Sequence, residues 1–142
     1  NETGLWSFGY GSKKVKVYDD LGRNISETRY DAARTNWGST WRMPTKDELE
    51  ELKKKCTWKW IVQNGVSGYK VTGPNGNSIF LPAAGYRYGA SLYYDGNYGY
   101  YWSSTPNGSY DNNAYGLGFY YGYENVGSYY RSHGQTVRPI TE

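Results

Sequence analysis

The stretch from Tyr86 to His133 constrains this chain most, because a few residue types fill it. It holds 14 of the 18 tyrosines, with Gly, Asn and Ser between them, and every lysine lies before it. Tyr mixed with small polar residues is typical of antibody binding loops, where Tyr supplies rigid contact area and the others supply adaptable hydrogen bonds. We therefore predict one domain over residues 1–142: a scaffold at 1–85, a ligand-binding region at 86–133 and a closing strand at 134–140.

Such a density of tyrosine predicts an exposed aromatic surface. A domain of 142 residues cannot bury this many rings and also find a hydrogen-bond partner for each hydroxyl. An exposed aromatic patch on a soluble protein usually marks an interface. The alternative interpretation is that the rings fill a β-rich core, or that the segment is a polar low-complexity region.

The predicted ligand-binding residues form two clusters along the chain. The main cluster consists of Tyr110, Asn112, Tyr120, Tyr121, Tyr123, Asn125, Tyr129, Tyr130, Ser132 and His133. The second cluster consists of Tyr88, Tyr93, Tyr94 and Tyr98.

The clearest secondary-structure signal lies in the scaffold. Thr45 is followed three residues later by Glu48, which is a capping box, and the lysines at 53–55 suit the C-terminal end of a helix. The sequence therefore predicts a helix from Lys46 to about Lys55. Its apolar positions Leu49, Leu52 and Cys56 fall on one face and should pack inward.

An earlier helix is predicted to begin at Ser26 as its N-cap and to end at Gly38. Tyr30, Ala33 and Trp37 would share its packed face.

Short strands make up most of the remaining pattern. Alternation predicts a strand or hairpin over Leu5–Tyr18, and Asp19–Gly22 has the composition of a turn. Strands are also predicted at 57–62, at 69–72 and 78–81 around a Gly-Pro-Asn-Gly-Asn turn, and at 134–140. Two helices followed by many strands predict an α+β fold.

The sequence offers no clear catalytic or metal-binding group. Cys56 is the single cysteine, which excludes an internal disulfide, and its place on the helix stripe favours a small core residue over a nucleophile. His133, the only histidine, has no marked triad partners. The loop acids are Asp95, Asp111 and Glu124, which lack the clustering that calcium needs. We expect no enzyme activity, no cofactor and no metal.

Charge and hydropathy argue against two kinds of partner, nucleic acids and the membrane interior. The net charge of +3 is spread along the chain, so we expect no nucleic-acid binding. No apolar run approaches the ~20 residues that a spanning helix needs, so we expect no direct membrane insertion by this segment. The tryptophans are expected in the core rather than as sugar platforms: 37, 41, 58, 60 and 102.

Several strings in fixed order resemble a known family. They are Trp41-Arg42-Met43-Pro44-Thr45, Gly68-Tyr69-Lys70-Val71, the run from Asn77 to Arg87, Tyr101-Trp102-Ser103-Ser104-Thr105 and Val137-Arg138-Pro139. Over about residues 26–140 the chain resembles the Fibrobacter/Bacteroides major paralogous domain, whereas residues 1–25 match poorly. The resemblance implies a C-type-lectin-like fold with two helices and several short, mostly antiparallel strands.

The wider fold includes variable proteins that diversity-generating retroelements mutate at adenines. The resemblance implies that the Tyr, Asn, Ser, Gly, Asp and His positions vary without cost to the core. The fixed framework would be Trp102, Ala114, Leu117, Phe119, Val126, Arg131 and Val137.

The implied function is a ligand-binding receptor or adhesin that is secreted or displayed on a cell surface, bacterial or phage-encoded. Its ligand would be a protein or glycan on another cell, a phage or a host surface. Two alternatives stay open: a carbohydrate-binding surface module of fixed specificity, and a degenerate relative of the formylglycine-generating enzymes. Those enzymes use a cysteine pair, which this chain lacks.

Overall fold

A computed structural model describes residues 24–141. The helices are α1 (Ala32–Trp37) and α2 (Lys46–Lys55). The strands are β1 (Trp41–Arg42), β2 (Thr57–Gln63), β3 (Val66–Thr72), β4 (Ser78–Pro82), β5 (Tyr86–Tyr88), β6 (Ser91–Tyr93), β7 (Tyr98–Pro106), β8 (Asn113–Tyr120), β9 (Tyr123–Tyr130) and β10 (Ile140–Thr141). This confirms the α+β class. The strand predicted at Leu5–Tyr18 and the turn at Asp19–Gly22 lie outside the described residues.

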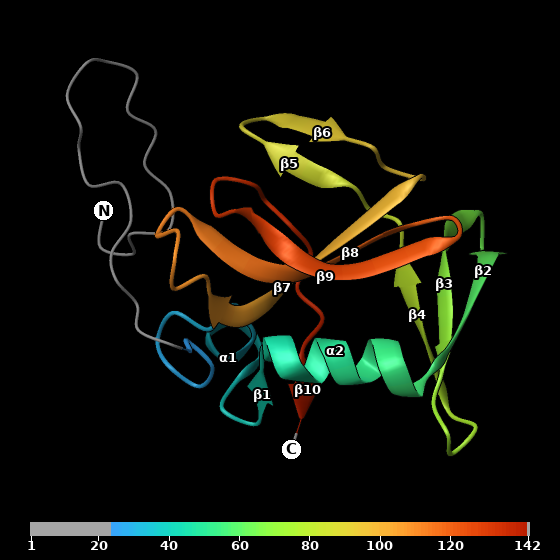
Figure 1. The fold of residues 1–142 in the computed structure, drawn as a ribbon, viewed down its shortest axis with the longest axis horizontal. Helices are drawn as coiled ribbons and strands as arrows, with labels where there is room; N and C mark the ends of the chain where they lie inside the picture. The colour runs from blue at the N-terminus through green and yellow to red at the C-terminus, as the bar shows by residue number, and fades with distance from the viewer. Residues whose placement is uncertain (1–23, 142) are drawn as a thin grey trace.

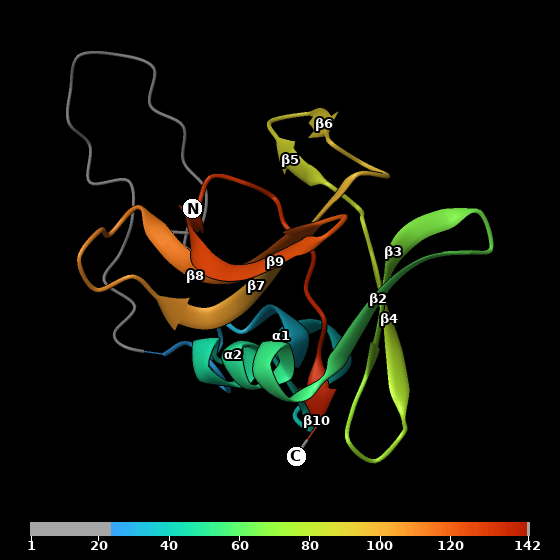
Figure 2. The same cartoon turned by 45° about the vertical axis from the view of Figure 1, so that its right-hand side comes forward.

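The described residues form four small antiparallel sheets. Their strand orders are β7-β8-β9, β2-β3-β4, β5-β6 and β1-β10. In Figure 1, α2 runs beneath the β7-β8-β9 sheet, while the β5-β6 hairpin stands above that sheet. The turned view in Figure 2 keeps the hairpin and α2 on opposite sides of the β7-β8-β9 sheet. The sheet therefore has one face toward the helix and one face toward the hairpin.

The helix α2 confirms the sequence prediction. The Thr45 hydroxyl accepts from the Glu48 N–H and the Glu48 carboxylate accepts from the Thr45 N–H, so both halves of the capping box are present. Leu49 is buried, and Leu52 and Cys56 pack against the same core. The helix α2 therefore packs against the inner face of the β7-β8-β9 sheet.

The first helix is shorter than predicted, and the prediction of Ser26 as its N-cap is wrong. The cap is Asp31, whose carboxylate accepts from the backbone N–H groups of Ala33 and Arg34. Residues 26–30 form turns instead. Gly38 does end the helix, with φ of 99°, whereas Trp37 is 54% exposed and does not belong to a packed face.

The predicted closing strand at 134–140 is also wrong as a continuous strand. Gly134 and Thr136 form isolated bridges with Arg87 and Tyr101, and the only regular part is β10, which pairs with β1. Pro139 lacks an N–H and interrupts the ladder. The C-terminal segment thus bonds to β5, β7 and β1 in turn and links three sheets rather than extending one.

Two hydrophobic cores hold these elements together. The larger lies between α2 and the sheets and contains Leu49, Tyr69, Val71, Leu81, Ala83, Tyr101, Leu117, Phe119 and Val126. The smaller lies under α1 and contains Ile25, Ala33, Met43 and Trp102. Trp58 and Trp60 pack against the larger core. The prediction that all five tryptophans lie in the core is wrong for Trp37 and Trp41, which are exposed.

Candidate ligand-binding surface

Strand alternation separates the core side of the sheet from its outer side. In β8, Leu117 and Phe119 are each 1% exposed and face the core, so Gly116, Gly118 and Tyr120 face the other way. The register places Tyr98 opposite Tyr120, and Tyr120 opposite Tyr123. A row of three tyrosines therefore crosses the outer face of the sheet.

The β5-β6 hairpin brings further rings to this row. Arg87 and Gly134 exchange two backbone hydrogen bonds of 2.7 Å, and the Gly85 N–H donates to the Tyr98 carbonyl at 2.7 Å. These contacts clamp the hairpin against β7 and the C-terminal segment. Any side chain at Gly85 would meet the Tyr93 carbonyl at 2.0 Å and would need φ of +64°, so glycine permits this close approach.

The rings form one connected network, which we call the tyrosine face. Centroid distances are 5.0 Å from Tyr123 to Tyr120, 5.2 Å from Tyr120 to Tyr98, 5.1 Å from Tyr98 to Tyr94 and 6.0 Å from Tyr94 to Tyr86. Its members are Tyr86, Tyr88, Tyr93, Tyr94, Tyr98, Tyr100, Tyr120, Tyr123, Tyr129, Tyr130 and His133. Most rings of the two clusters that are separate in the sequence are thus joined in a single surface.

His133 joins the hairpin to the sheet. Its ring stacks on Tyr86 at 4.5 Å and meets Tyr88 and Tyr130 edge-on, at 5.8 Å each. Burial among these rings lowers the pKa of His133 below its usual value. The imidazole is therefore mostly neutral at pH 7 and acts here as a further aromatic ring.

Tyr129 is half-buried and packs against the sheet rather than standing free for a ligand. Its ring lies over the glycines of β8, since a Cβ at Gly118 would be 2.1 Å from the Tyr129 hydroxyl and one at Gly116 would be 3.4 Å from its ring. Burial raises the pKa of Tyr129 to about 12. Tyr129 thus packs on the sheet and supports the face.

This packing corrects the prediction that all Gly and Tyr positions in the region vary without cost to the core. A Cβ at Gly116 would also lie 2.7 Å from the Tyr101 carbonyl oxygen, a backbone atom that cannot move aside cheaply. The predicted framework fares better: Trp102, Leu117, Phe119, Val126 and Arg131 are buried, and Ala114 and Val137 are half-buried.

The structure leaves most predicted contact residues accessible. The exposed ones are Tyr88, Tyr93, Tyr94, Tyr110, Tyr120, Tyr121, Tyr123 and Tyr130. The half-buried ones are Tyr98, Asn112, Asn125, Tyr129, Ser132 and His133.

Two predicted tyrosines lie apart from the network of rings, the predicted Asn112, Asn125 and Ser132 carry no ring, and two members of the network were missed. Tyr121 meets Trp60 at 6.1 Å, and Tyr110 lies in the loop between β7 and β8. Tyr86 and Tyr100 were not predicted, although Tyr100 follows Tyr98 by two residues and so shares its side of β7. Strand alternation could not identify Tyr86, because its position depends on the long-range contacts that hold the β5-β6 hairpin against β7.

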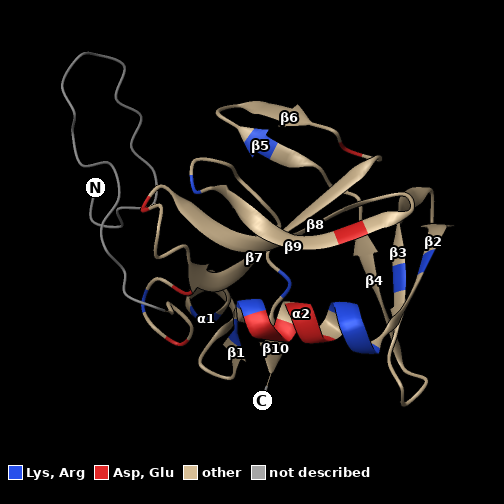
Figure 3. Ribbon diagram, in the orientation of Figure 1, with Lys and Arg blue, Asp and Glu red and all other residues tan. Residues whose placement is uncertain are grey.

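Charge is scarce on the sheet that carries the face. Figure 3 shows charged residues concentrated on α2, whereas β7 and β8 carry none and β9 carries Glu124. Arg87 lies on β5. Asp95, Asp111 and Glu124 do not gather, and no group of three or more potential metal ligands occurs within residues 24–141. The face therefore presents rings, hydroxyls and amides rather than charge.

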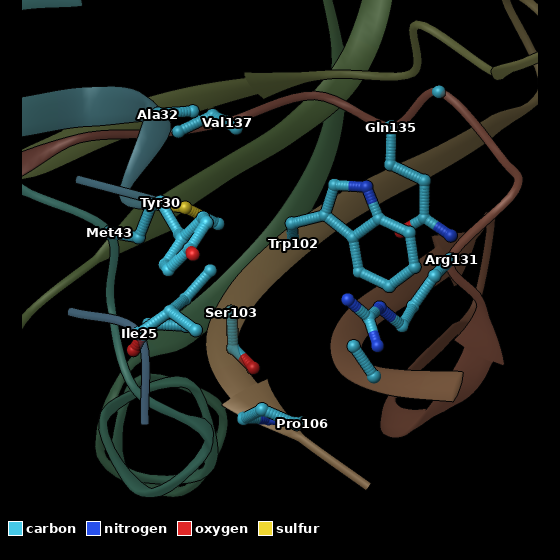
Figure 4. A pocket seen from close by; sticks show the side chains of 13 residues that line it. Ile25, Tyr30, Ala32, Met43, Trp102, Ser103, Pro106, Arg131, Gln135 and Val137 are labelled. Carbon is cyan, nitrogen blue, oxygen red and sulfur yellow. The ribbon is translucent and has the colours of Figure 1, made fainter. Parts of the chain in front are cut away.

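A pocket of about 220 Å³ lies beside the smaller core. Figure 4 shows Trp102, Gln135 and Arg131 on one side of it and Ile25, Tyr30 and Met43 on the other. Within residues 24–141, both amide atoms of Gln135 and the Ser104 hydroxyl are buried without a hydrogen-bond partner. The described lining contains no carboxylate, histidine or thiol, so it offers no acid–base pair.

The part of the chain that the structure describes has no helix long and apolar enough to cross a membrane. A family model described as the Lcl C-terminal domain matches residues 13–141. No curated protein and no solved structure matches the chain.

Proposed function

Because the chain belongs to the Lcl C-terminal domain family, we propose that it is a ligand-binding domain whose tyrosine face recognises a protein or glycan on another surface. The observation that carries this proposal is the connected set of exposed rings across β5, β6, β7, β8 and β9. Interfaces draw most of their affinity from a few aromatic anchors, and tyrosine supplies them at low entropic cost.

The fold that best accounts for this arrangement is C-type-lectin-like. Two helices, small antiparallel sheets and a C-terminal half of short strands that carries the exposed rings support it. An experimental structure that superposes on C-type lectin domains through α2 and the β7-β8-β9 sheet would bear this out, and a different connectivity would refute it.

We further propose that a retroelement diversifies the exposed part of this face. The separation of buried framework residues such as Leu117 and Phe119 from exposed Tyr120 and Tyr123 supports it. The encoding gene tests it directly. A neighbouring reverse transcriptase and a near-copy of the 3′ end that differs only at adenines are expected, and an unvarying 3′ end in sibling genomes would refute it.

The same face argues for binding rather than catalysis. Its rings, hydroxyls and amides suit recognition, and it contains no charged nucleophile–base pair in the described residues. We propose a non-enzymatic protein, secreted or displayed on the surface of a bacterium or phage, that does not bind nucleic acid or insert this segment into a membrane.

The experiment is a binding comparison on arrays of glycans and purified surface proteins. The test variant carries Tyr94→Ala, Tyr120→Ala and Tyr123→Ala, which remove three exposed rings. The control variant carries Trp37→Ala and Val62→Ala, which remove equally exposed apolar side chains away from the face. The test variant should bind at least about tenfold more weakly, since each anchor contributes about 1–2 kcal/mol, while the control matches the wild type.

Equal loss in both variants, or no loss in the test variant, would refute the proposal. Binding to one sugar structure, shared by sequence siblings, would favour a carbohydrate-binding module of fixed specificity over a diversified receptor.

A further inference from the structure

Strand β9 is an open edge of the main sheet. The opposite edge, along β7, is bonded: the Trp102 N–H donates to the Thr136 carbonyl, and the Thr136 N–H donates to the Tyr100 carbonyl. Within residues 24–141, no backbone group bonds the outer side of β9 between 124 and 128. As far as the described residues go, the sheet therefore ends in a row of unpaired amides and carbonyls on one side only.

The register identifies which groups point outward. The Arg131 N–H donates to the Asn112 carbonyl, one step beyond the pair of Tyr130 with Asn113. Bonded and non-bonded pairs alternate along an antiparallel ladder. The odd-numbered residues of β9 therefore bond β8, and the even-numbered ones, Glu124, Val126, Ser128 and Tyr130, direct their N–H groups away from the sheet.

This edge lacks the features that usually prevent strand pairing. Native edges carry lysine, proline or a bulge, as β2 carries Lys59 and β4 ends in Pro82. β9 contains neither residue type and pairs with β8 without a register shift along its whole length. Its only charged residue is Glu124. Among the described residues, the one lysine that reaches this strand is Lys53 of α2, whose Nζ donates to the Asn125 side chain at 3.4 Å and would have to move aside if another strand paired there.

We propose that β9 pairs antiparallel with β9 of a second copy of this chain, across a two-fold axis at Gly127. In this register Glu124 lies opposite Tyr130 of the second copy, and Val126 lies opposite Ser128. Each outward N–H then meets a carbonyl, and no like charges face each other. The Tyr130 carbonyl, which already accepts from the His133 N–H at 3.0 Å, would accept the Glu124 N–H of the second copy as a further bond. Gly127 meets its own symmetry mate, so no side chain crowds the axis. An edge that complements itself is what a two-fold dimer requires.

The pairing has a consequence for recognition. It joins two three-stranded sheets into one six-stranded sheet, so the two tyrosine faces lie on the same side. A ligand with repeated epitopes would then be held at two points, which raises avidity without new contacts. The dimer itself does not depend on the tyrosine face being a binding surface.

The test compares Ser128→Pro with Ser128→Ala in the full 142-residue chain. Both variants lose the bonds that the Ser128 hydroxyl accepts from Asn107 and Asn113. Only proline removes the outward N–H, and proline is tolerated on an edge strand where that group faces solvent. Analytical ultracentrifugation should give twice 16.2 kDa for the wild type and Ser128→Ala at high concentration, and 16.2 kDa for Ser128→Pro.

Amide hydrogen exchange locates the interface. The amides of Glu124, Val126 and Ser128 should become protected as protein concentration rises, while those of Asn125 and Gly127 stay protected throughout. The proposal is overturned if the wild type stays monomeric, or if Ser128→Pro dimerises as well as Ser128→Ala. It is also overturned if the even-numbered amides are protected in the monomer, because another segment of the same chain then covers the edge.

Discussion

At the residue scale, Asp31 organises the entry into the domain. Its side chain is fully buried, and its carboxylate accepts from the backbone N–H groups of Glu27, Ala33, Arg34 and Met43, at 2.9–3.2 Å. One carboxylate therefore caps α1 and also ties α1 to the segment that leads into α2. The cap bonds to Ala33 and Arg34 are local, so an aspartate before this helix was a signal that the sequence prediction passed over. The bond to Met43 spans 12 positions and leaves no such signal.

Asp31→Ala should lower the free energy of unfolding by about 3 kcal/mol, since it removes a helix cap and leaves several buried N–H groups without an acceptor. Urea denaturation measures this. Asp31→Asn is the matched control: it keeps one acceptor oxygen, so it should lose less. A loss in Asp31→Ala no larger than that of an ordinary surface substitution would contradict this role.

At the element scale, α2 depends on a charged cap. Arg42 contacts both oxygens of Glu48, at 2.7 and 2.8 Å, and the Thr45 N–H donates to the same carboxylate at 2.8 Å. The hydrogen bond from Arg42, followed by the bond from Thr45, lowers the pKa of Glu48 to about 2. Because the folded pKa lies below the unfolded value, the ionised cap stabilises the fold above pH 4.5, and this stabilisation is lost as the pH falls toward 2.

Glu48→Gln should therefore be less stable than the wild type at neutral pH, and the difference should shrink between pH 4.5 and pH 2. Denaturation curves recorded across this range provide the measurement. Glu51→Gln is the control, since Glu51 pairs with Lys55 on the exposed side of the same helix and surface pairs contribute little. Parallel pH profiles for Glu48→Gln and the wild type would rule out the charged cap.

Local signals predicted some elements well and others poorly. The α2 cap and the β3-β4 turn are set by neighbours within a few residues, so the sequence identified them. The tie from Asp31 to Met43 spans 12 positions, and the C-terminal segment takes its partners from β1, β5 and β7. Those contacts are distant in the chain and leave no local pattern.

At the scale of the whole molecule, buried packing and exposed tyrosines are divided between the two faces of one sheet. The inner face packs on α2 through Leu117, Phe119 and Val126, and the outer face carries the tyrosines. The composition predicted that tyrosine rings would be exposed. The two predicted clusters of tyrosines come together only because backbone hydrogen bonds at Gly85 and Arg87 hold the β5-β6 hairpin against the sheet. The two faces are not fully separate in role, because Gly116 and Tyr129 lie on the outer face and still pack tightly against their neighbours.

Hydroxyl-radical footprinting of the chain, with and without a ligand found on the arrays, tests the central claim most directly. Side chains under a bound ligand lose solvent contact and react more slowly. The tyrosine-face account predicts slower labelling of Tyr94, Tyr120 and Tyr123 on binding, with Trp37 unchanged. Unchanged labelling of those tyrosines, with protection around Trp37 or elsewhere outside the tyrosine face, would contradict it.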